Sequence, residues 1–395
     1  MTVPTGPQGE SRRPAQRLLF LVSSMHGGGA ERVAATLASA WARRGDEVTL
    51  VCCYSGRGRC DQVLDPGVRL VWLADRMRGP AWLRPITKLM ALRRLAREYR
   101  PDRVLSFLTN VNVTALLALR GLGLPIVVGE RTDPAYSINL QSSLRQLRRW
   151  TYPWARRVAV QTPRSARHLL QVAPGVRRIA VIPNPLPDGL PAVRVHEPAS
   201  PRRTLAALGR FNPVKQFDQL IECFATLAPQ CPDWDLCIWG DGAQREACLQ
   251  RVRALGLESR IRLPGFSRTP WEDLASSAHA FVLNSRVEGF PNALLEAMAL
   301  GLPCVATDCP SGPAELTLDG QLAELVPLDD GPALAQALLR VMQAGPAERE
   351  TRGRTAAESV RARYGLDAIL RDWDDAWTEA DGIRGAAGHE PPLAP

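Results

Sequence analysis

The sequence has few of the residue patterns from which metal sites are built. It contains nine Cys, an odd number, with no C-x-x-C pair, and its five His show no ligand spacing. Zinc sites need such clusters, so neither a structural nor a catalytic zinc site is expected. Several Cys, including Cys52, Cys53 and Cys237, fall inside predicted strands. This pattern indicates reduced, partly buried thiols of a cytoplasmic protein.

Long apolar segments are missing too. No run of 18 or more apolar residues occurs, so we expect no membrane-spanning helix. Residues 1–16 are polar and rich in Pro, Gly and Arg, without the apolar stretch of a signal peptide, and we expect a disordered tail there and another at 382–395. The chain has 395 residues, of which 45% are apolar and 23% charged, which favours two domains with ordinary cores.

The first glycine-rich loop does not form a dinucleotide fingerprint. A predicted strand, Leu18–Ser24, precedes Gly27-Gly28-Gly29, and a helix and a second strand, Val48–Cys53, follow. This order predicts a doubly wound parallel sheet. The loop lacks the G-x-G-x-x-G spacing and no acid ends the second strand, so a nicotinamide-dependent dehydrogenase is the weaker hypothesis. Three glycines still let the backbone approach an anion closely.

Strands and helices alternate along the chain, with one Pro-rich interruption at Pro183–Arg203. We therefore expect an α/β protein of two doubly wound domains with a cleft between them, where ligands bind at the carboxyl ends of the strands. The expected parts are domains at 17–190 and 204–365, a linker at 191–203 and a last helix at 366–381 that packs back on the first domain. Further strands are predicted at Val68–Leu73, Arg103–Leu108, Ile126–Gly129, Val158–Gln161, Ile179–Ile182, Leu205–Leu208, Leu236–Trp239, Ile261–Leu263, Ala280–Leu283, Cys304–Ala306 and Leu325–Val326.

Two carboxylates eight residues apart mark the most informative stretch, Ser285–Gly301. Glu288 is expected on the loop after a strand, since Gly289 and Pro291 then break the chain. Glu296 is expected about one turn into the helix that follows. The N-terminus of that helix offers free N–H groups and a positive dipole end, which suits a phosphate between the two acids.

Two cations stand on the loop after the first strand of the second half. Arg210 supplies a guanidinium for bidentate contacts and Lys215 an ammonium as a point charge, a combination that suits a diphosphate. No Asp-x-Asp follows the carboxyl end of a predicted strand.

The Ser285–Gly301 stretch resembles the E-x7-E motif of the retaining GT-B glycosyltransferases of family 4. Val181–Pro185 and Leu208–Phe217 resemble the segments that precede this motif in the family. The resemblance implies two Rossmann-like domains, the first binding the acceptor and the second a nucleotide sugar, and it covers nearly the whole ordered chain. It also implies transfer of a hexose or N-acetylhexosamine from a donor that we expect to be UDP-linked, with retention and without a metal or other cofactor.

The same resemblance implies roles for single residues. Arg210 and Lys215 would hold the donor diphosphate and Glu296 the donor ribose, and Glu288 would meet the transferred sugar, so that Glu288, Arg210 and Lys215 form the catalytic set. The remaining donor contacts would come from the two glycines of the first domain, from the segment that lines the base and from the loop after Glu288. These residues are Gly28, Gly29, Gly265, Phe266, Gly289, Phe290, Pro291 and Asn292.

The sequence departs from the family where many relatives carry a His after the fifth strand. Here it has Glu130-Arg131-Thr132-Asp133-Pro134. Glu130 is a candidate for a donor-sugar or acceptor contact, with a loop acid paired to Arg131 as the alternative; Asn184 and His26 are further candidates. Together with Met25–Arg32, this segment resembles bacterial transferases that add N-acetylgalactosamine, galactose or related sugars to lipid-linked oligosaccharides.

A basic stretch between Gln141 and Leu170 holds seven Arg and no acid. Trp and Tyr beside Arg are typical of an anionic membrane interface, whereas no nucleic-acid-binding motif is present. We expect a cytoplasmic protein held on the inner leaflet, with a polyprenyl-diphosphate-linked or other glycan acceptor. The alternatives are a GT-B nucleotide-sugar epimerase and a non-catalytic basic binding protein; the sequence predicts no oligomeric state. The expected membrane contacts are Arg145, Arg148, Arg149, Trp150, Trp154, Arg156 and Arg157.

Overall fold

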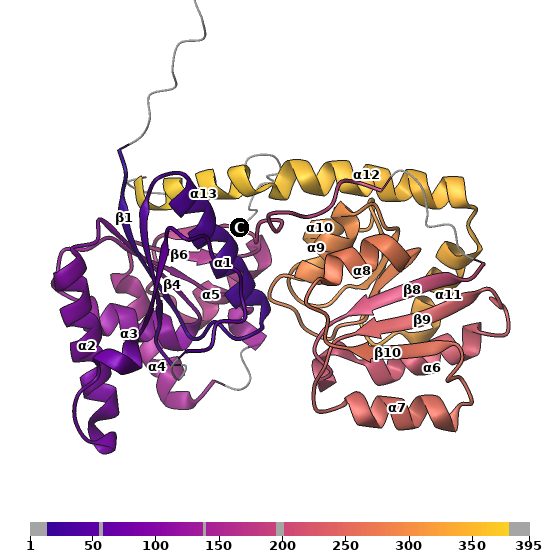
Figure 1. Ribbon diagram of the computed structural model, residues 1–395, viewed down its shortest axis with the longest axis horizontal. Helices are drawn as coiled ribbons and strands as arrows, with labels where there is room; N and C mark the ends of the chain where they lie inside the picture. The colour runs from indigo at the N-terminus through magenta and orange to yellow at the C-terminus, as the bar shows by residue number, and fades with distance from the viewer. Residues whose placement is uncertain (1–13, 55–57, 137–139, 195–200, 379–395) are drawn as a thin grey trace, which may run out of the picture. The chain divides into compact units, whose positions relative to one another are not determined.

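The computed structural model describes residues 14–54, 58–136, 140–194 and 201–378. Their contacts divide them into two compact units. The first unit holds the residues up to Val128 together with Trp154–Arg156, and the second unit holds Gly129–Pro153 and the residues from Arg157 onward. Figure 1 shows parallel strands flanked by helices in both parts of the chain.

The first sheet contains seven parallel strands in the order β3-β2-β1-β4-β5-β6-β7. Its central strands are buried, as expected where helices cover both faces of a sheet. The register pairs Leu18 with Val48 on one side of β1 and with Arg103 on the other. Its strands are β1 (Arg17–Val22), β2 (Glu47–Cys52), β3 (Val68–Trp72), β4 (Arg103–Phe107), β5 (Ile126–Gly129), β6 (Arg157–Val160) and β7 (Ile179–Val181).

Five α-helices accompany these strands. The start of α5 is capped: the Thr162 hydroxyl accepts a hydrogen bond from the Ser165 N–H, and Pro163 occupies the first turn. The helices are α1 (Gly29–Arg43), α2 (Arg84–Tyr99), α3 (Thr109–Leu119), α4 (Ser142–Thr151) and α5 (Pro163–Val172), with short 3₁₀ turns η1 (Leu73–Arg76), η2 (Ala81–Leu83), η3 (Pro134–Tyr136) and η4 (Tyr152–Trp154).

The second sheet has six parallel strands in the order β10-β9-β8-β11-β12-β13. Its two faces have separate apolar cores, because successive side chains of a strand point to opposite sides. Leu205 and Val282 belong to one core, whereas Ala206 and Phe281 belong to the other. The strands are β8 (Arg203–Leu208), β9 (Trp234–Trp239), β10 (Ile261–Gly265), β11 (Ala280–Leu283), β12 (Cys304–Thr307) and β13 (Glu324–Val326).

Helices cover both faces of the six-stranded sheet (Figure 1). One core includes buried side chains of α6, α7 and α11, and the other includes those of α8, α9, α10 and α12. The bounds are η5 (Pro213–Lys215), α6 (Phe217–Leu227), α7 (Arg245–Ala254), α8 (Pro270–Ser277), α9 (Asn292–Ala299), α10 (Pro313–Thr317), α11 (Gly331–Gln343), α12 (Pro346–Tyr364) and α13 (Leu366–Thr378).

The long helix α12 lies directly against the end of α9. A Cβ on Gly353 would lie 1.9 Å from the carbonyl oxygen of Gly301, so only glycine permits this approach of the two backbones. The guanidinium of Arg361 also donates to the carbonyls of Ala299 and Pro191, which fixes part of the Pro-rich segment onto the second unit.

The predicted α/β architecture with two doubly wound sheets is confirmed, and every predicted strand lies within two residues of an observed one. Residues 81–99 form η2 followed by α2, with Pro85 in the first turn of α2. Within the described residues, none of the nine Cys forms a disulfide, and seven of them are buried. The predicted tails at 1–16 and 382–395 fall almost entirely outside the described residues. Within the described part, no helix is both long and apolar enough to cross a membrane.

Candidate functional site

The loops after β8 and β11 lie next to each other at the carboxyl edge of the second sheet. Their strands are parallel neighbours, with Leu205 opposite Ala280 and Ala206 opposite Phe281. The Arg286 N–H donates to the Val214 carbonyl at 2.8 Å, which joins the two loops directly. The sheet therefore brings the two predicted cations and the first predicted carboxylate to one place.

The backbone around Lys215 is held in a compact turn. The Asn212 side chain accepts a hydrogen bond from the Lys215 N–H at 3.2 Å, which caps the 3₁₀ turn η5. A Cβ on Gly209 would lie 3.1 Å from the Cε atom of Lys215. The lysine stem thus lies over a glycine backbone, and a larger residue at position 209 would displace it.

Lys215 and Glu288 form an ion pair in the structure. The Lys215 Nζ and Glu288 Oε1 atoms are 2.5 Å apart, and the two side chains are 18% and 12% exposed. The sequence suggested separate partners for them, the diphosphate for Lys215 and the sugar for Glu288. Direct pairing gives the ammonium a fixed position and partly neutralises it in the absence of a ligand.

The other predicted donor-binding residues differ in exposure. Arg210 is exposed on the loop after β8, and Phe266 presents an exposed ring just after β10. Gly265 adopts a φ of +98°, which favours glycine. Glu296 is buried in α9. The exposed Arg210, the exposed ring of Phe266 and the Lys215–Glu288 pair thus follow the carboxyl ends of β8, β10 and β11, three strands of one sheet.

The start of α9 is fixed by a buried amide network. The Asn184 Oδ1 atom accepts from Arg131 Nη1 at 2.9 Å and from Gln161 Nε2 at 2.8 Å. The Asn184 amide donates to Asn292 Oδ1 at 2.7 Å. Burial lowers the pKa of the Arg131 guanidinium to about 9, an effect that Glu130 opposes. Arg131 and Asn184, predicted as sugar or acceptor contacts, therefore position the first residue of α9.

The Arg131 backbone contacts the loop after Glu288 at Gly289; we call this loop, Gly289–Pro291, the motif loop. A Cβ at position 289 would lie 2.4 Å from the Arg131 carbonyl oxygen, so this close approach needs glycine. Phe290 and Pro291, the next residues of the loop, are buried. The loop after Glu288 is thus packed tightly against the segment that starts at Gly129.

Glu130 is buried and already bonded. Its carboxylate accepts a short hydrogen bond, 2.5 Å, from the Tyr152 hydroxyl, and the buried Arg148 Nη1 atom lies 4.0 Å from it. The structure thus gives Glu130 internal partners from α4 and η4. Its contact with a sugar or acceptor stays a prediction.

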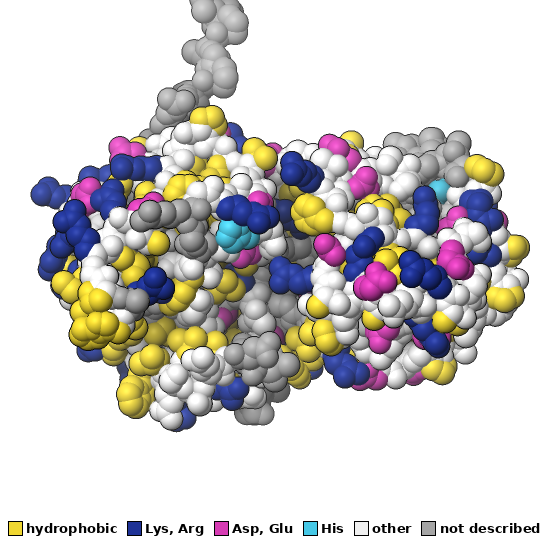
Figure 2. Space-filling model, turned by 60° about the horizontal axis from the view of Figure 1, so that its bottom comes forward, with side chains coloured by type: hydrophobic (Ala, Val, Ile, Leu, Met, Phe, Trp, Pro, Cys, Tyr) yellow, Lys and Arg dark blue, Asp and Glu magenta, His cyan; other side chains and the backbone are white. Residues whose placement is uncertain are grey.

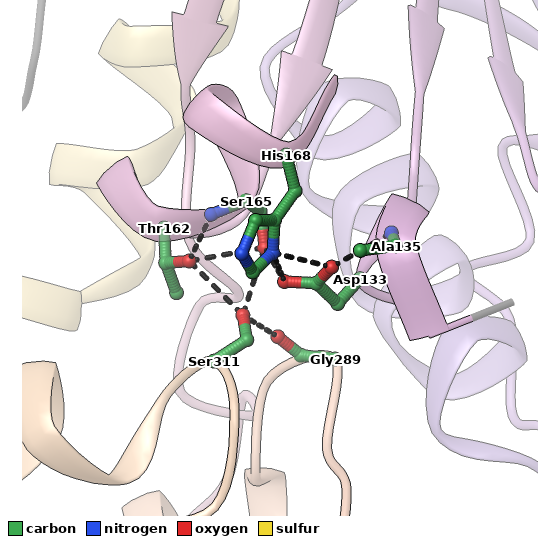
Figure 3. Close-up of polar contacts among 7 residues, drawn as sticks. All are labelled: Asp133, Ala135, Thr162, Ser165, His168, Gly289 and Ser311. Atoms are coloured by element: carbon green, nitrogen blue, oxygen red, sulfur yellow. Dashed lines mark hydrogen bonds and ion pairs between the residues drawn. The ribbon is translucent and has the colours of Figure 1, made fainter. Parts of the chain in front are cut away.

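The sequence did not predict a second buried hydrogen-bond network (Figure 3). Asp133 accepts hydrogen bonds from the Ser165 hydroxyl at 3.0 Å, and its carboxylate oxygens lie 2.8 and 2.9 Å from His168 Nδ1. The Ser311 hydroxyl lies 2.8 Å from that of Ser165 and donates to the Gly289 carbonyl at 2.9 Å. The network therefore ties the motif loop to α5. Its members lie up to 178 positions apart, between Asp133 and Ser311, and no local sequence signal links them.

An acidic side chain, Glu31, lies close to the glycine-rich loop of the first unit. A Cβ on Gly28 would lie 2.3 Å from a carboxylate oxygen of Glu31, in the first turn of α1. The His26 Nδ1 atom lies 3.9 Å from Asp61, which also accepts from the Gly27 N–H. An anion at this helix start would meet the Glu31 carboxylate. The predicted donor contacts of Gly28 and Gly29, and the ligand contact of His26, stay predictions.

The predicted membrane surface between Arg145 and Arg157 is wrong for two of its residues. Arg148 and Arg157 are among the buried side chains, since their guanidinium groups lie inside the fold. Trp154 is exposed but lies under the guanidinium of Arg120, 3.7 Å from the ring centroid. Of the predicted membrane contacts on α4, Arg145, Arg149 and Trp150 are exposed.

Two family models match the sequence. "Glycosyltransferase Family 4" matches residues 27–188, and "Glycosyl transferases group 1" matches residues 202–344, which includes Lys215, Glu288 and Glu296. The chain belongs to this glycosyltransferase family. This match supports a glycosyltransferase over the two alternatives, a nucleotide-sugar epimerase and a non-catalytic binding protein.

Curated relatives of this glycosyltransferase include enzymes of bacterial glycan synthesis. It is 28% identical over 373 residues to the amylovoran biosynthesis glycosyltransferase AmsD of Erwinia amylovora, covering 91% of this chain and 99% of the relative. It is 25% identical to a Campylobacter jejuni N-acetylgalactosaminyltransferase whose name specifies a PP-undecaprenol acceptor, covering 82% and 89%. A 35% identical match covers 51% of this chain but spans only about a fifth, 21%, of the exopolysaccharide phosphotransferase SCO2592 of Streptomyces coelicolor.

Solved structures support the GT-B fold. The apo lipopolysaccharide outer core galactosyltransferase WaaB superposes with a TM-score of 0.70 at 20% identity, covering 91% of this chain and 98% of that one. HepE of Anabaena, solved with UDP-glucose, superposes with a TM-score of 0.72 at 19% identity over the same shares. At these identities the similarity concerns the fold.

Proposed function

We propose that this glycosyltransferase moves a hexose or N-acetylhexosamine from a UDP-sugar to a polyprenyl-diphosphate-linked glycan, with retention of configuration and without a metal ion. The observation that carries the proposal is the Lys215–Glu288 pair, 2.5 Å apart, on the loops of two neighbouring parallel strands. The carboxyl edge of such a sheet is where nucleotide ligands bind.

The positive groups at this edge suit a leaving nucleoside diphosphate. Lys215 is placed on a capped turn, Arg210 is exposed on the same loop, and α9 begins four residues after Glu288. Cations and a helix N-terminus that are already in position stabilise charge as it develops. In this proposal they do what Mg²⁺ does in metal-dependent transferases.

The proposed transfer takes place on one face of the sugar. The bond from the sugar C1 to the diphosphate oxygen breaks as the bond from C1 to the acceptor oxygen forms. The acceptor hydroxyl proton passes to the departing phosphate oxygen, so no enzymic nucleophile is assigned. Glu288 stabilises the positive charge that develops at the sugar, and Glu296 holds the ribose hydroxyls. Phe266 stacks on the nucleotide base.

The acceptor proposal depends on the relatives. One Campylobacter jejuni relative acts, by its name, on a PP-undecaprenol-linked glycan, and AmsD takes part in amylovoran biosynthesis. A polyprenyl diphosphate resides in a membrane, so we propose a cytoplasmic enzyme bound to the inner leaflet. Arg148 and Arg157 are buried, so the predicted surface at Arg145–Arg157 does not carry the membrane part of this proposal.

A donor panel tests this function. Purified enzyme is incubated with UDP-, GDP- and ADP-sugars and a polyprenyl-diphosphate-linked oligosaccharide, with and without EDTA. We expect turnover with a UDP-sugar, no loss in EDTA, and a product whose anomeric NMR coupling matches that of the donor. Inverted product would contradict retention, loss in EDTA would contradict metal independence, and an inert panel would contradict the donor and acceptor classes.

A further inference from the structure

The first turns of α2 carry large apolar side chains on the outside of the protein. Trp82 is 78% exposed, Ile86 55% and Met90 59%. Their spacing of four residues puts them along one side of η2 and α2. Soluble proteins rarely leave three such side chains in a row uncovered unless the patch contacts something. We call these three residues the α2 patch.

The opposite side of α2 explains why this patch faces outward. Ala91, Leu92, Leu95 and Ala96 are buried, and α2 packs against α3. The helix thus has one apolar side in the core of the first unit and a second apolar side, the α2 patch, on the surface. Packing within the first unit explains why the buried side of α2 is apolar, but it does not explain the apolar residues of the α2 patch.

Charge around the α2 patch is almost entirely positive. Residues 76–100 contain eight Lys and Arg and one acid, Glu98, which pairs with Arg76 at 2.9 Å. Arg84 lies beside the patch, and Arg94 and Arg97 continue along the exposed face toward the C-terminus of α2. Hydrophobic side chains gather at the lower left of Figure 2, where Figure 1 draws α2, with dark blue Lys and Arg side chains nearby.

We propose that the α2 patch is the membrane-docking surface of this enzyme and that its occupant is an anionic lipid bilayer. An interfacial helix needs Trp and aliphatic side chains that enter the headgroup boundary and basic side chains that meet anionic headgroups. The α2 patch supplies the first set, and Arg84, Arg94 and Arg97 supply the second. The inference rests on the proposed function for its purpose, since a polyprenyl-diphosphate acceptor lies in a membrane.

Charge distinguishes a bilayer from the other possible occupants. A second copy of the chain would place one basic α2 against another, which repels. An acidic protein would form ion pairs with the arginines, but it would also need an apolar surface to cover the three side chains of the α2 patch. In a bilayer, the acyl region can contact the α2 patch while the anionic headgroups contact the arginines, whose long side chains extend to them.

Vesicle flotation of the full chain tests the proposal. Vesicles of phosphatidylcholine alone are compared with an equimolar mixture of phosphatidylcholine and phosphatidylglycerol, with no donor or acceptor present. We expect binding to the anionic vesicles that weakens as salt is added. The triple variant Trp82→Ala, Ile86→Ser, Met90→Ser is expected to lower the bound fraction at least about tenfold, and Arg94→Glu with Arg97→Glu to remove the salt-sensitive part.

Trp150→Ala is the control, and it also tests α4, the surface that the sequence predicts as the membrane contact. Trp150 is 64% exposed on α4, another basic helix, so its loss removes an equal side chain from a different surface. We expect this control to float like the wild type. Thermal unfolding of each variant checks folding, which the exposed substitutions are expected to leave intact.

Three outcomes would overturn the docking proposal. These are a wild type that binds no vesicle, a triple variant that floats like the wild type, and a Trp150→Ala variant that loses as much binding as the triple variant. A wild-type dimer that the triple variant dissociates would assign the α2 patch to a second copy instead. Flotation needs no sugar transfer, so vesicle binding without turnover would reject the proposed function and leave the docking surface standing.

Discussion

At the residue scale, a substitution in the Lys215–Glu288 pair is expected to affect diphosphate binding and sugar transfer in opposite directions. Glu288→Gln removes the negative charge 2.5 Å from Lys215 Nζ. The ammonium then has no competing carboxylate, so a nucleoside diphosphate is expected to bind about three- to tenfold more tightly. Sugar transfer is expected to fall about a hundredfold, because the group that meets the developing charge is lost. Calorimetric titration and initial rates measure the two effects.

The control for this prediction is Glu258→Gln. Glu258 is exposed after α7, and its substitution changes the net charge of the chain by the same amount. Equal tightening in both variants would show a general charge effect. Weaker nucleotide binding in Glu288→Gln would mean that Glu288 holds Lys215 in position and does not compete with the ligand.

Gly289 provides a second residue-scale prediction. A Cβ there would lie 2.4 Å from the Arg131 carbonyl oxygen, so Gly289→Ala must shift a buried backbone, at a cost of about 1–3 kcal/mol. We expect a lower melting temperature and lower turnover. Gly331→Ala, where no atom lies within 4 Å of the added Cβ, is the matched control and should leave both unchanged. An unaltered melting temperature for Gly289→Ala would show that the loop has room to relax.

Residue chemistry could be predicted from the sequence only in part. The resemblance to the family motif grouped Arg210, Lys215, Glu288 and Glu296, and the structure brings Lys215 and Glu288 together at one sheet edge. The direct bond between Lys215 and Glu288 was not predicted, since pairing across 73 positions depends on how two loops pack. For the same reason the internal partners of Glu130, Arg131 and Asn184 were not predicted; their contacts with a sugar or acceptor stay predictions.

At the element scale, α13 carries a carboxylate that burial disfavours. Desolvation raises the pKa of Asp372 from the ordinary 3.8 to about 6, and Asp375 adds to the shift. The folded state therefore holds this proton more tightly than the unfolded state, and stability falls as pH rises from about 4 to about 6. Asp372→Asn is expected to raise the melting temperature above pH 6, by an amount on the order of 1 °C because Asp372 is partly solvated, and to have no effect near pH 4.

Melting curves of the wild type and Asp372→Asn across this pH range check the prediction. A difference that is constant at all pH values would mean that the carboxamide acts through packing or hydrogen bonding and that protonation of Asp372 is irrelevant.

Elements were the most predictable level of the structure. Short apolar runs bounded by Gly and Pro located the strands, because parallel strands covered by helices are apolar on both faces. The arginines and aromatic residues of α4 suggested a membrane-binding surface, and its buried face was not predicted, although Arg148 and Thr151 are buried. The α2 patch was not predicted either, because whether an apolar side chain is exposed depends on tertiary packing.

At the scale of the whole molecule, the two sheets have different roles in the proposed function. The six-stranded sheet carries Lys215, Glu288 and Glu296, whereas the first unit carries the α2 patch. Donor binding and membrane docking are therefore expected to be separable. The triple variant of the α2 patch should bind nucleotide like the wild type in solution, and coupled losses would contradict this division.

The central claim is that Lys215 holds the diphosphate of a nucleotide sugar at the edge of the second sheet. The chain contains only one other lysine, Lys88, on α2, which makes Lys88→Ala a matched control. The most direct measurement is calorimetric titration of UDP into the wild type, Lys215→Ala and Lys88→Ala in the absence of vesicles. We predict at least about tenfold weaker binding for Lys215→Ala and no change for Lys88→Ala. Equal affinities for Lys215→Ala and the wild type would contradict the account.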